Sequence, residues 1–258
     1  MKGKIVIVTG GSNGMGKAMA KRFAEKGAYV TISGRNQEKL EQARREIETF
    51  DGQVLPFVMD VRDIQQVDQM VTETIEKFGG IDYLVNNAAG NFLVPAEQLT
   101  VNGWNSVIDI VLNGTWYCTQ AVAKHWIEEK KIGSIINMVA TYAWTAGPGV
   151  VHSASAKAGV LAMTRTLAVE WGSKYGIRVN AIAPGPIEDT GGTEKLILNE
   201  NMHRNLINSI PAKRFGTVDE VAGVAEFLFL EEAKYINGDC ITLDGGQWLS
   251  GAAYQFTE

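Results

Sequence analysis

Short apolar runs alternate with longer amphipathic segments along this chain, and no other feature of the sequence constrains the fold as strongly. The apolar runs are rich in β-branched residues, which is typical of strands. Runs such as IVIV (5–8) and YLVN (83–86) are continuously apolar, as expected of strands buried on both faces of a parallel sheet. We predict seven strands, over residues 4–9, 28–33, 53–58, 81–86, 134–139, 177–182 and 239–244.

The segments between these strands have the length and periodicity of helices. They cover residues 14–26, 37–49, 63–78, 103–130, 154–174 and 218–230. Strands that alternate with crossover helices predict an α/β fold of the Rossmann type, a doubly wound parallel sheet with helices on both faces. No repeat, linker or low-complexity tract divides the 258 residues, so we expect a single domain over 1–258.

Composition excludes several classes of partner. The formal net charge of -5 gives no general basic surface, which argues against nucleic acid or an anionic membrane as the main partner. The apolar run at the N-terminus is too short to span a membrane, so a soluble cytoplasmic protein is expected. Cys118 and Cys240 lie far apart and are interpreted as core residues. The three histidines, His125, His152 and His203, have no metal-ligand spacing, and no metal is expected.

The stretch TGGSNGMG follows the first predicted strand and opens the first helix. Glycines permit a tight turn and a close approach of backbone amides to a pyrophosphate, while the helix N-terminus supplies N–H donors. The strand-turn-helix context is the one that a dinucleotide site requires. We therefore expect cofactor contacts from this turn, at Gly10, Ser12, Asn13, Gly14, Met15 and Gly16.

The second strand indicates which dinucleotide binds. An NAD site usually carries a carboxylate at its end, but Gly34 and Arg35 stand there. A guanidinium can bind the 2′-phosphate of NADP in a bidentate way, so NADP(H) is the expected cofactor, although a solvated surface arginine is the alternative. After the third strand, Asp60 and Val61 are expected beside the adenine, with a helix N-cap near Asp63 as a competing role for this region.

The least regular stretch, about residues 185–215, begins with PGPIEDTGG and continues with rough helical periodicity. A mobile lid over a ligand fits such a segment, and an ordinary surface excursion fits nearly as well.

Four motifs together resemble the short-chain dehydrogenase/reductase family over essentially the whole chain. They are TGGSNGMG, NNAAG (86–90), SASAKAGV (153–160) and VNAIAPGPI (179–187). The resemblance implies that the asparagine run with Asn87 and Ala88 supports the cofactor and that Lys157 binds the nicotinamide ribose. It also places Pro184, Gly185 and Ile187 beside the nicotinamide. The two longest predicted helices, over residues 103–130 and 154–174, are similar to those through which this family builds symmetric tetramers. A homotetramer is therefore expected.

The departures from the family pattern are informative. The usual catalytic tetrad is Asn, Ser, Tyr and Lys, and the matching positions here hold Val111, Ala140, Ser153 and Lys157. None of the seven tyrosines has a lysine four residues later.

A narrower resemblance, to the 2,4-dienoyl-CoA reductases, accounts for this change. It is carried by NNAAGNF (86–92), ATYAW (140–144), SASAKAGV and APGPIEDTGG (183–192). In that branch the tyrosine lies 15 residues before the lysine, and Tyr142 fulfils this count. The resemblance implies a catalytic set of Asn91, Tyr142, Ser153 and Lys157, and an acyl-CoA thioester substrate.

The displacement of the tyrosine makes chemical sense. In a dienoyl thioester the hydride adds at Cδ, whereas negative charge develops on the thioester oxygen several bonds away. Tyr142 and Asn91 are expected to stabilise this oxygen, Lys157 to hold the nicotinamide ribose, and Ser153 to support the lysine or the substrate. Protonation at Cα then gives a 3-enoyl-CoA. The product fits the breakdown of unsaturated fatty acids.

Two other functions stay open at this point. One is reduction of another enoyl thioester or of a carbonyl substrate, and the other is a catalytically silent NADPH-binding module. Candidate acyl contacts are Phe92, Trp144, Ile187 and Leu196, and candidate contacts for CoA phosphates are Arg62, Arg165, Lys213 and Arg214, although ordinary packing or solvation explains each of them as well.

Overall fold

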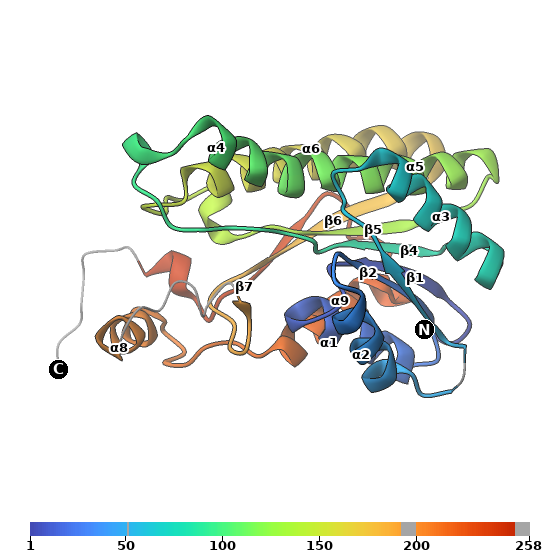
Figure 1. Cartoon of the computed structure of the whole chain (residues 1–258), viewed down its shortest axis with the longest axis horizontal. Coiled ribbons are helices and arrows are strands. Elements are labelled where there is room, and N and C mark those ends of the chain that lie inside the picture. Colours follow the sequence, from blue (N-terminus) through green and yellow to red (C-terminus); the bar gives the residue numbers. More distant parts are fainter. Residues whose placement is uncertain (51, 192–199, 251–258) are drawn as a thin grey trace.

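A parallel sheet forms the middle layer of the molecule (Figure 1). The computed structural model describes residues 1–50, 52–191 and 200–250. Within these ranges the strands are β1 (Ile5–Thr9), β2 (Tyr29–Gly34), β3 (Val54–Val58), β4 (Tyr83–Asn86), β5 (Ser134–Met138), β6 (Arg178–Pro184) and β7 (Cys240–Leu243). All seven predicted strands are present, with ends that differ by at most two residues from the predicted ones.

The strand order is β3-β2-β1-β4-β5-β6-β7, and every pairing is parallel. The chain therefore runs outward from β1 in one direction and from β4 in the other. The crevice beyond the carboxyl ends of β1 and β4 is the topological switch point at which such sheets bind ligands. The predicted doubly wound α/β fold is confirmed.

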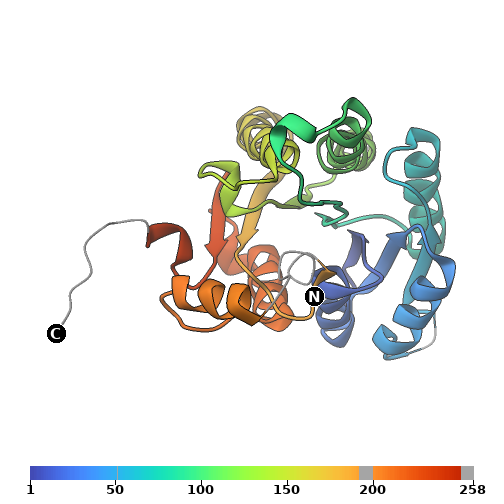
Figure 2. The same ribbon diagram turned by 60° about the vertical axis from the view of Figure 1, so that its left-hand side comes forward.

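Helices cover both faces of the sheet (Figures 1 and 2). They are α1 (Gly14–Glu25), α2 (Gln37–Ile47), α3 (Ile64–Phe78), α4 (Val101–Ile108), α5 (Gly114–Glu128), α6 (Val151–Tyr175), α8 (Glu200–Ser209) and α9 (Val218–Phe229). In Figure 1 helices α3 to α6 lie over one face, whereas α1, α2 and α9 lie over the other. Short 3-10 turns are η1 (Ala96–Gln98), η3 (Thr141–Ala143), η4 (Glu231–Ala233) and η5 (Gln247–Leu249).

The apolar side chains of the strands pack into a core on each face. One core joins β1 and β2 to α1, α2 and α9 and includes the fully buried Phe23 and Ile32. The other joins the sheet to α3, α5 and α6 around Trp126, whose indole N–H donates to the backbone oxygen of Ile81 at 2.8 Å. A third cluster between α4 and α6 includes Val111.

The segment predicted as one helix over 103–130 is continuous but not uniform. It starts at Val101, because the side chain of Thr100 accepts from the backbone N–H of Gly103 and caps it. A π-helical turn, η2 (Asp109–Asn113), separates α4 from α5. Such bulges are frequent at functional sites, and Val111, at the family's asparagine position, lies in this one.

The irregular segment predicted over about 185–215 includes α8. Its residues 192–199 lie outside the described ranges, so the lid stays a prediction. Cys118 and Cys240 are both free thiols, and of the two predicted core residues Cys118 is buried whereas Cys240 is partly exposed. Over the described part of the chain, no helix is both long and apolar enough to cross a membrane.

Candidate active site

The glycine turn after β1 is shaped by backbone conformation and by close packing. Gly10 and Gly14 have φ angles of 63° and 50°, in the left-handed region that favours glycine. A Cβ on Gly16 would lie 2.3 Å from the carbonyl oxygen of Gly10, so α1 packs against the turn only because residue 16 has no side chain. Asn87 braces this turn, because its Nδ2 donates to the backbone oxygens of Thr9 and Gly10 at 3.1 Å each.

The N-terminus of α1 fits an anionic group. The side chain of Asn13 makes no capping hydrogen bond, and no acidic residue lies in the first turn. Among the described residues, the backbone N–H groups of Gly14, Met15 and Gly16 have no hydrogen-bond partner. A helix N-terminus with free amides favours a phosphate. These residues therefore fit the pyrophosphate of a dinucleotide, and their role in binding it stays a prediction.

A second cationic area adjoins this turn at the end of β2. Ser12, Asn13, Lys17 and Lys39 line a cavity of about 200 Å³. Lys17 pairs with Glu46 at 2.7 Å, whereas neither Lys39 nor the exposed Arg35 forms an ion pair within the described ranges. Unpaired cations beside a hydroxyl suit a phosphate ester, such as the 2′-phosphate of NADP.

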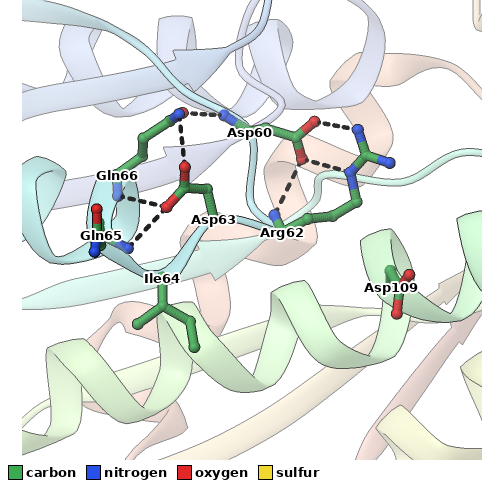
Figure 3. A pocket seen from close by; sticks show the side chains of 7 residues that line it. All are labelled: Asp60, Arg62, Asp63, Ile64, Gln65, Gln66 and Asp109. Carbon is green, nitrogen blue, oxygen red and sulfur yellow. Dashed lines mark hydrogen bonds and ion pairs between the residues drawn. The ribbon is translucent and has the colours of Figure 1, made fainter.

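Asp60 lies in a shallow cavity of about 660 Å³ that Figure 3 shows from close by. Its carboxylate accepts from the guanidinium of Arg62 at 3.0 and 2.6 Å and from the backbone N–H of Arg62 at 3.0 Å. This hydrogen bonding to Arg62 lowers the pKa of Asp60, which therefore stays an acceptor. The N-cap of α3 is Asp63, so the competing capping role does not fall on Asp60.

The other sequence-predicted cofactor residues lie around the same crevice. The side chain of Val61 is buried against Gly114 of α5, and the backbone N–H of Ala88 donates to Thr9 Oγ1 at 3.0 Å. Gly185 follows β6 directly and packs against Asp244, where a Cβ would lie 2.6 Å from the Cβ of Asp244. Ile187 is only 2% exposed and its side chain belongs to the core, while its backbone oxygen accepts from Thr190 Oγ1 at 2.8 Å.

Tyr142 and Ser153 meet directly. Tyr142 lies in η3 after β5, and Ser153 lies in the first turn of α6, which packs against η3. Their hydroxyl oxygens are 3.1 Å apart. Burial raises the pKa of Tyr142, and the hydrogen bond with Ser153 opposes this shift, so the phenol stays protonated and able to donate.

Lys157 lies one helical turn after Ser153, so both side chains project from one face of α6. The side chain of Lys157 is buried, and its Nζ donates to the backbone oxygen of Met138 at 2.5 Å. No counterion accompanies it among the described residues, and burial lowers its pKa to about 8. The ammonium group is therefore a hydrogen-bond donor poised at the end of β5.

Asn91, the fourth predicted catalytic residue, comes from the loop after β4. Its Oδ1 accepts from the backbone N–H of Phe92 at 2.9 Å, which leaves its Nδ2 hydrogens available. Within the described ranges it makes no hydrogen bond to Tyr142, Ser153 or Lys157. The structure thus brings three of the four residues together and places Asn91 on a neighbouring loop.

The candidate acyl and CoA contacts divide by environment. Phe92 is 39% exposed, and Trp144 packs edge-on against Trp248 with ring centroids 5.8 Å apart. Leu196 lies outside the described residues. Of the basic candidates, Arg62 pairs with Asp60, Arg214 pairs with Glu220, and Lys213 donates to the backbone of Asn208. Arg165 is exposed and forms no ion pair within the described ranges.

Two features of this region were missed from the sequence. A buried network joins β4 and β5 to the helices, because Asn86 Nδ2 donates to Asn137 Oδ1 and to Thr119 Oγ1 at 2.8 Å each. The sequence offered one signal for this network, because the predicted strands 81–86 and 134–139 each contain an asparagine. The second feature is His152, which is fully buried beside Ser153. The described residues hold no cluster of three or more His, Cys, Asp or Glu side chains that could bind a metal.

Comparisons with known proteins agree with this geometry. The family described as Enoyl-(Acyl carrier protein) reductase matches residues 10–247. A Bacillus subtilis (strain 168) protein named probable 2,4-dienoyl-CoA reductase [(2E)-enoyl-CoA-producing] is 62% identical over 97% of this chain and 98% of its own length. A Caenorhabditis elegans protein named probable 2,4-dienoyl-CoA reductase 3 [(3E)-enoyl-CoA-producing] is 43% identical over 96% of this chain and 81% of its own.

A solved structure extends the likeness to the whole fold. It is the crystal structure of a short chain dehydrogenase from Bacillus anthracis, which is 61% identical to this chain. The two superpose with a TM-score of 0.91 over 98% of this chain and 99% of the other. With the glycine turn, the strand order and the serine-lysine helix in place, the chain belongs to the short-chain dehydrogenase/reductase family of oxidoreductases.

Proposed function

We propose that this protein is an NADPH-dependent 2,4-dienoyl-CoA reductase. The observation that carries the proposal is the 3.1 Å contact between Tyr142 and Ser153. Ser153 occupies the position where the family's tyrosine is expected, so the contact returns a phenol to the neighbourhood of Lys157 from a different loop. The names of two relatives, 62% and 43% identical, support the same reaction.

The protein's contribution to the reaction is to bind, orient and donate hydrogen bonds. NADPH, when bound, supplies the hydride that adds to Cδ of the dienoyl thioester. The displaced electron pair moves through the conjugated system to the thioester oxygen. The Tyr142 O–H and the Asn91 amide N–H are the donors that stabilise this oxygen, and such donors typically contribute about 10²–10³ in rate.

Other residues hold the cofactor. The free amides at the start of α1 suit the pyrophosphate, Arg35 and Lys39 suit the 2′-phosphate, and Asp60 accepts from the adenine amino group. Lys157 binds the nicotinamide ribose, while Ser153 holds the Tyr142 hydroxyl in place. The apolar side chains of Phe92 and Trp144 line the way for the acyl chain.

The final step determines the product. Protonation of the dienolate at Cα leaves a double bond between Cβ and Cγ, which gives 3-enoyl-CoA, and protonation at Cγ gives 2-enoyl-CoA. We propose protonation at Cα by a bound water. Protonation at Cγ is the alternative, and the name of the Bacillus subtilis relative, which specifies a (2E)-enoyl product, favours it.

One experiment tests both the reaction and its product. The purified protein is incubated with NADPH and 2,4-hexadienoyl-CoA in D₂O, and the absorbance of both substrates is followed. We expect joint loss of the two absorbances and deuterium at Cα in the NMR spectrum of the product. Deuterium at Cγ would overturn the 3-enoyl assignment, and no turnover with any dienoyl chain length would overturn the reductase.

A second candidate activity is reduction of a 2-enoyl thioester, which the description of the matching family favours. Crotonyl-CoA in place of the dienoyl substrate separates the two, since only an enoyl reductase consumes NADPH with it. A simple ketone substrate is disfavoured, because Ser153 and Ala140 replace the usual tyrosine and serine. A silent module is disfavoured because Lys157 and a suitably placed tyrosine are both present.

A cytoplasmic location and a homotetramer are also proposed. The outer face of α6 carries Val169, which is 75% exposed, and an apolar residue there suits a helix that packs against a second copy. Light scattering of the purified protein should give four times the 28.1 kDa chain mass. A monomer would contradict the proposal.

A further inference from the structure

The two groups proposed to bind the substrate oxygen lie on different loops. Tyr142 is held by Ser153, but within the described ranges Asn91 makes no hydrogen bond to either residue. Donors that act on one oxygen must keep a fixed separation, because an error of about 1 Å can cost 10²-fold in rate. Something in the structure therefore has to hold the Asn91 loop against the Tyr142 loop.

In the described part of the chain, two contacts join the Asn91 loop to the segment that follows Tyr142, one in the loop before α6 and one at the start of α6. The backbone N–H of Val94 donates to the backbone oxygen of Gly149 at 3.0 Å. The ring of Phe92 packs against the ring of His152, with centroids 4.5 Å apart and an interplanar angle of 79°. The second contact reaches closer to the site, since Phe92 is the neighbour of Asn91 and His152 is the neighbour of Ser153.

In the described part of the chain, no other interaction accounts for His152. It is fully buried, and neither of its ring nitrogens has a hydrogen-bond partner in the part of the chain that the structure describes. Buried polar groups are normally paired, and an unpaired one weakens the fold compared with an apolar side chain of similar size. Within the described residues, the specific interaction of this ring is therefore the edge-to-face contact with Phe92.

Phe92 transmits this contact to Asn91. Its ring is also confined on the side of α4, where a Cβ on Gly103 would lie 3.1 Å from Phe92 Cζ. Its backbone N–H is the group that binds Asn91 Oδ1. Fixing the ring of Phe92 therefore fixes the backbone that holds the Asn91 side chain with its Nδ2 hydrogens free.

We propose that His152 is a positioning residue that acts through Phe92 to hold Asn91 at a set distance from Tyr142. The expected effect on catalysis rests on the proposed function. The expected effect on the position of the Asn91 loop does not depend on it. The contact between His152 and Phe92 exists whatever the substrate, so it is tested first without one.

Hydrogen exchange measures the structural part. In His152→Leu, we expect the amides of Phe92 and Val94 to exchange at least about fivefold faster, since both report on the loop that loses its anchor. The amides of β5 serve as an internal reference. His152→Phe, which keeps a ring, should exchange like the wild type, as should Ser155→Ala, an exposed control on the same turn of α6. Unchanged exchange in His152→Leu would overturn the proposal.

A second variant covers failure of the first to fold. Phe92→Leu removes the same contact from the exposed side, and we expect the same increase in exchange at Val94. If exchange at Val94 is unchanged in Phe92→Leu, the contact does not anchor the loop.

A double-mutant cycle tests the catalytic part with NADPH and 2,4-hexadienoyl-CoA. His152→Leu should lower kcat about tenfold with the KM for NADPH unchanged, because it touches no group assigned to the cofactor. In an Asn91→Ala background the same substitution should have no further effect. Additive losses, or rescue of kcat by His152→Gln but not by His152→Phe, would show that the imidazole acts independently of Asn91. Absence of wild-type turnover would refute the proposed function alone, since the exchange data need no substrate.

Discussion

The hydroxyl oxygens of Tyr142 and Ser153 are 3.1 Å apart, although the two residues are 11 positions apart in the chain. Ser153 stands four residues before Lys157, where the family's catalytic tyrosine is expected. The site therefore keeps a phenol near its lysine but approaches it from the loop after β5 instead of from α6. This shift moves the phenol away from its usual position on α6, as the proposed substrate, whose oxygen is distant from the reduced carbon, requires.

Replacing Tyr142 by Phe should lower kcat for dienoyl-CoA reduction by about 10²–10³. The phenyl ring preserves the packing in η3, whereas the hydroxyl is lost, and with it the contact with Ser153 and the proposed donor to the thioester oxygen. The Kd for NADPH, measured by fluorescence titration, should stay within about twofold of the wild-type value, because no cofactor contact is assigned to the phenol.

Tyr235 offers a matched control for this substitution. It is fully exposed, and its replacement by Phe should leave kcat and the NADPH Kd unchanged. A Tyr142→Phe enzyme that keeps more than half of the wild-type kcat would remove the phenol from the mechanism.

The fold was predictable because it depends on periodicity. Each apolar run became a strand, and the alternation with helices gave the parallel sheet. The π-helical turn at Asp109–Asn113 was not predictable, since no Gly or Pro marks it and tertiary packing decides it. The early start of α6 at Val151 was missed as well, because its first residue has no capping side chain ahead of it.

The site was predictable where spacing alone fixes geometry. The serine-lysine face of α6 follows from one helical turn, and the tight turn after β1 follows from its glycines. The contact between His152 and Phe92 was not predictable, because it joins the loop after β4 to the first turn of α6, and tertiary packing decides how these segments approach. The bidentate pairing of Asp60 with Arg62 was missed for a similar reason, since it depends on the loop conformation after β3.

Lys157 should make the stability of the protein depend on pH. Its pKa is about 8 in the folded chain and about 10.4 when unfolded, so the unfolded state binds more protons between these values. Stability therefore rises with pH across this window, and burial of the charged form costs on the order of 3 kcal/mol below it. Lys157→Met should remove this dependence, as measured by urea unfolding of the cofactor-free protein at pH 7 and pH 10.

The pH difference separates ionisation from packing. Loss of the hydrogen bond to Met138 lowers the free energy of unfolding of Lys157→Met by the same amount at pH 7 and pH 10. The difference in stability between the two pH values therefore reports only the titration of Lys157. Lys174→Met, at an exposed position in the last turn of α6, is the control. Between pH 7 and pH 10 its free energy of unfolding should change by the same amount as that of the wild type. If the free energy of unfolding of Lys157→Met shows the same pH dependence as that of the wild type, the ammonium is not buried in the folded state.

Arg35→Ala should raise the KM for NADPH at least about tenfold and change the KM for NADH by less than about twofold, because a guanidinium pairs with the 2′-phosphate that only NADPH carries. The measurement is initial rate against each cofactor at saturating dienoyl-CoA. Arg45→Ala is the control, since Arg45 is a 74% exposed arginine of α2 with one long ion pair. Equal effects on both cofactors would show that Arg35 does not discriminate between them.

Gly16→Ala should weaken NADPH binding by at least about 100-fold and lower stability by about 1–3 kcal/mol, as overpacking does. The new Cβ would lie 2.3 Å from the Gly10 oxygen and 2.5 Å from Asn87 Nδ2, so the phosphate-binding turn has to move away from α1. Gly223→Ala is the matched control in α9, because the nearest atom to its Cβ, in Arg22, is 3.9 Å away. This control should bind NADPH normally and gain about 0.5–1 kcal/mol, since alanine is the better helix former. Calorimetry and cofactor titration of both variants make the comparison, and normal NADPH binding by Gly16→Ala would show that the turn does not hold the pyrophosphate.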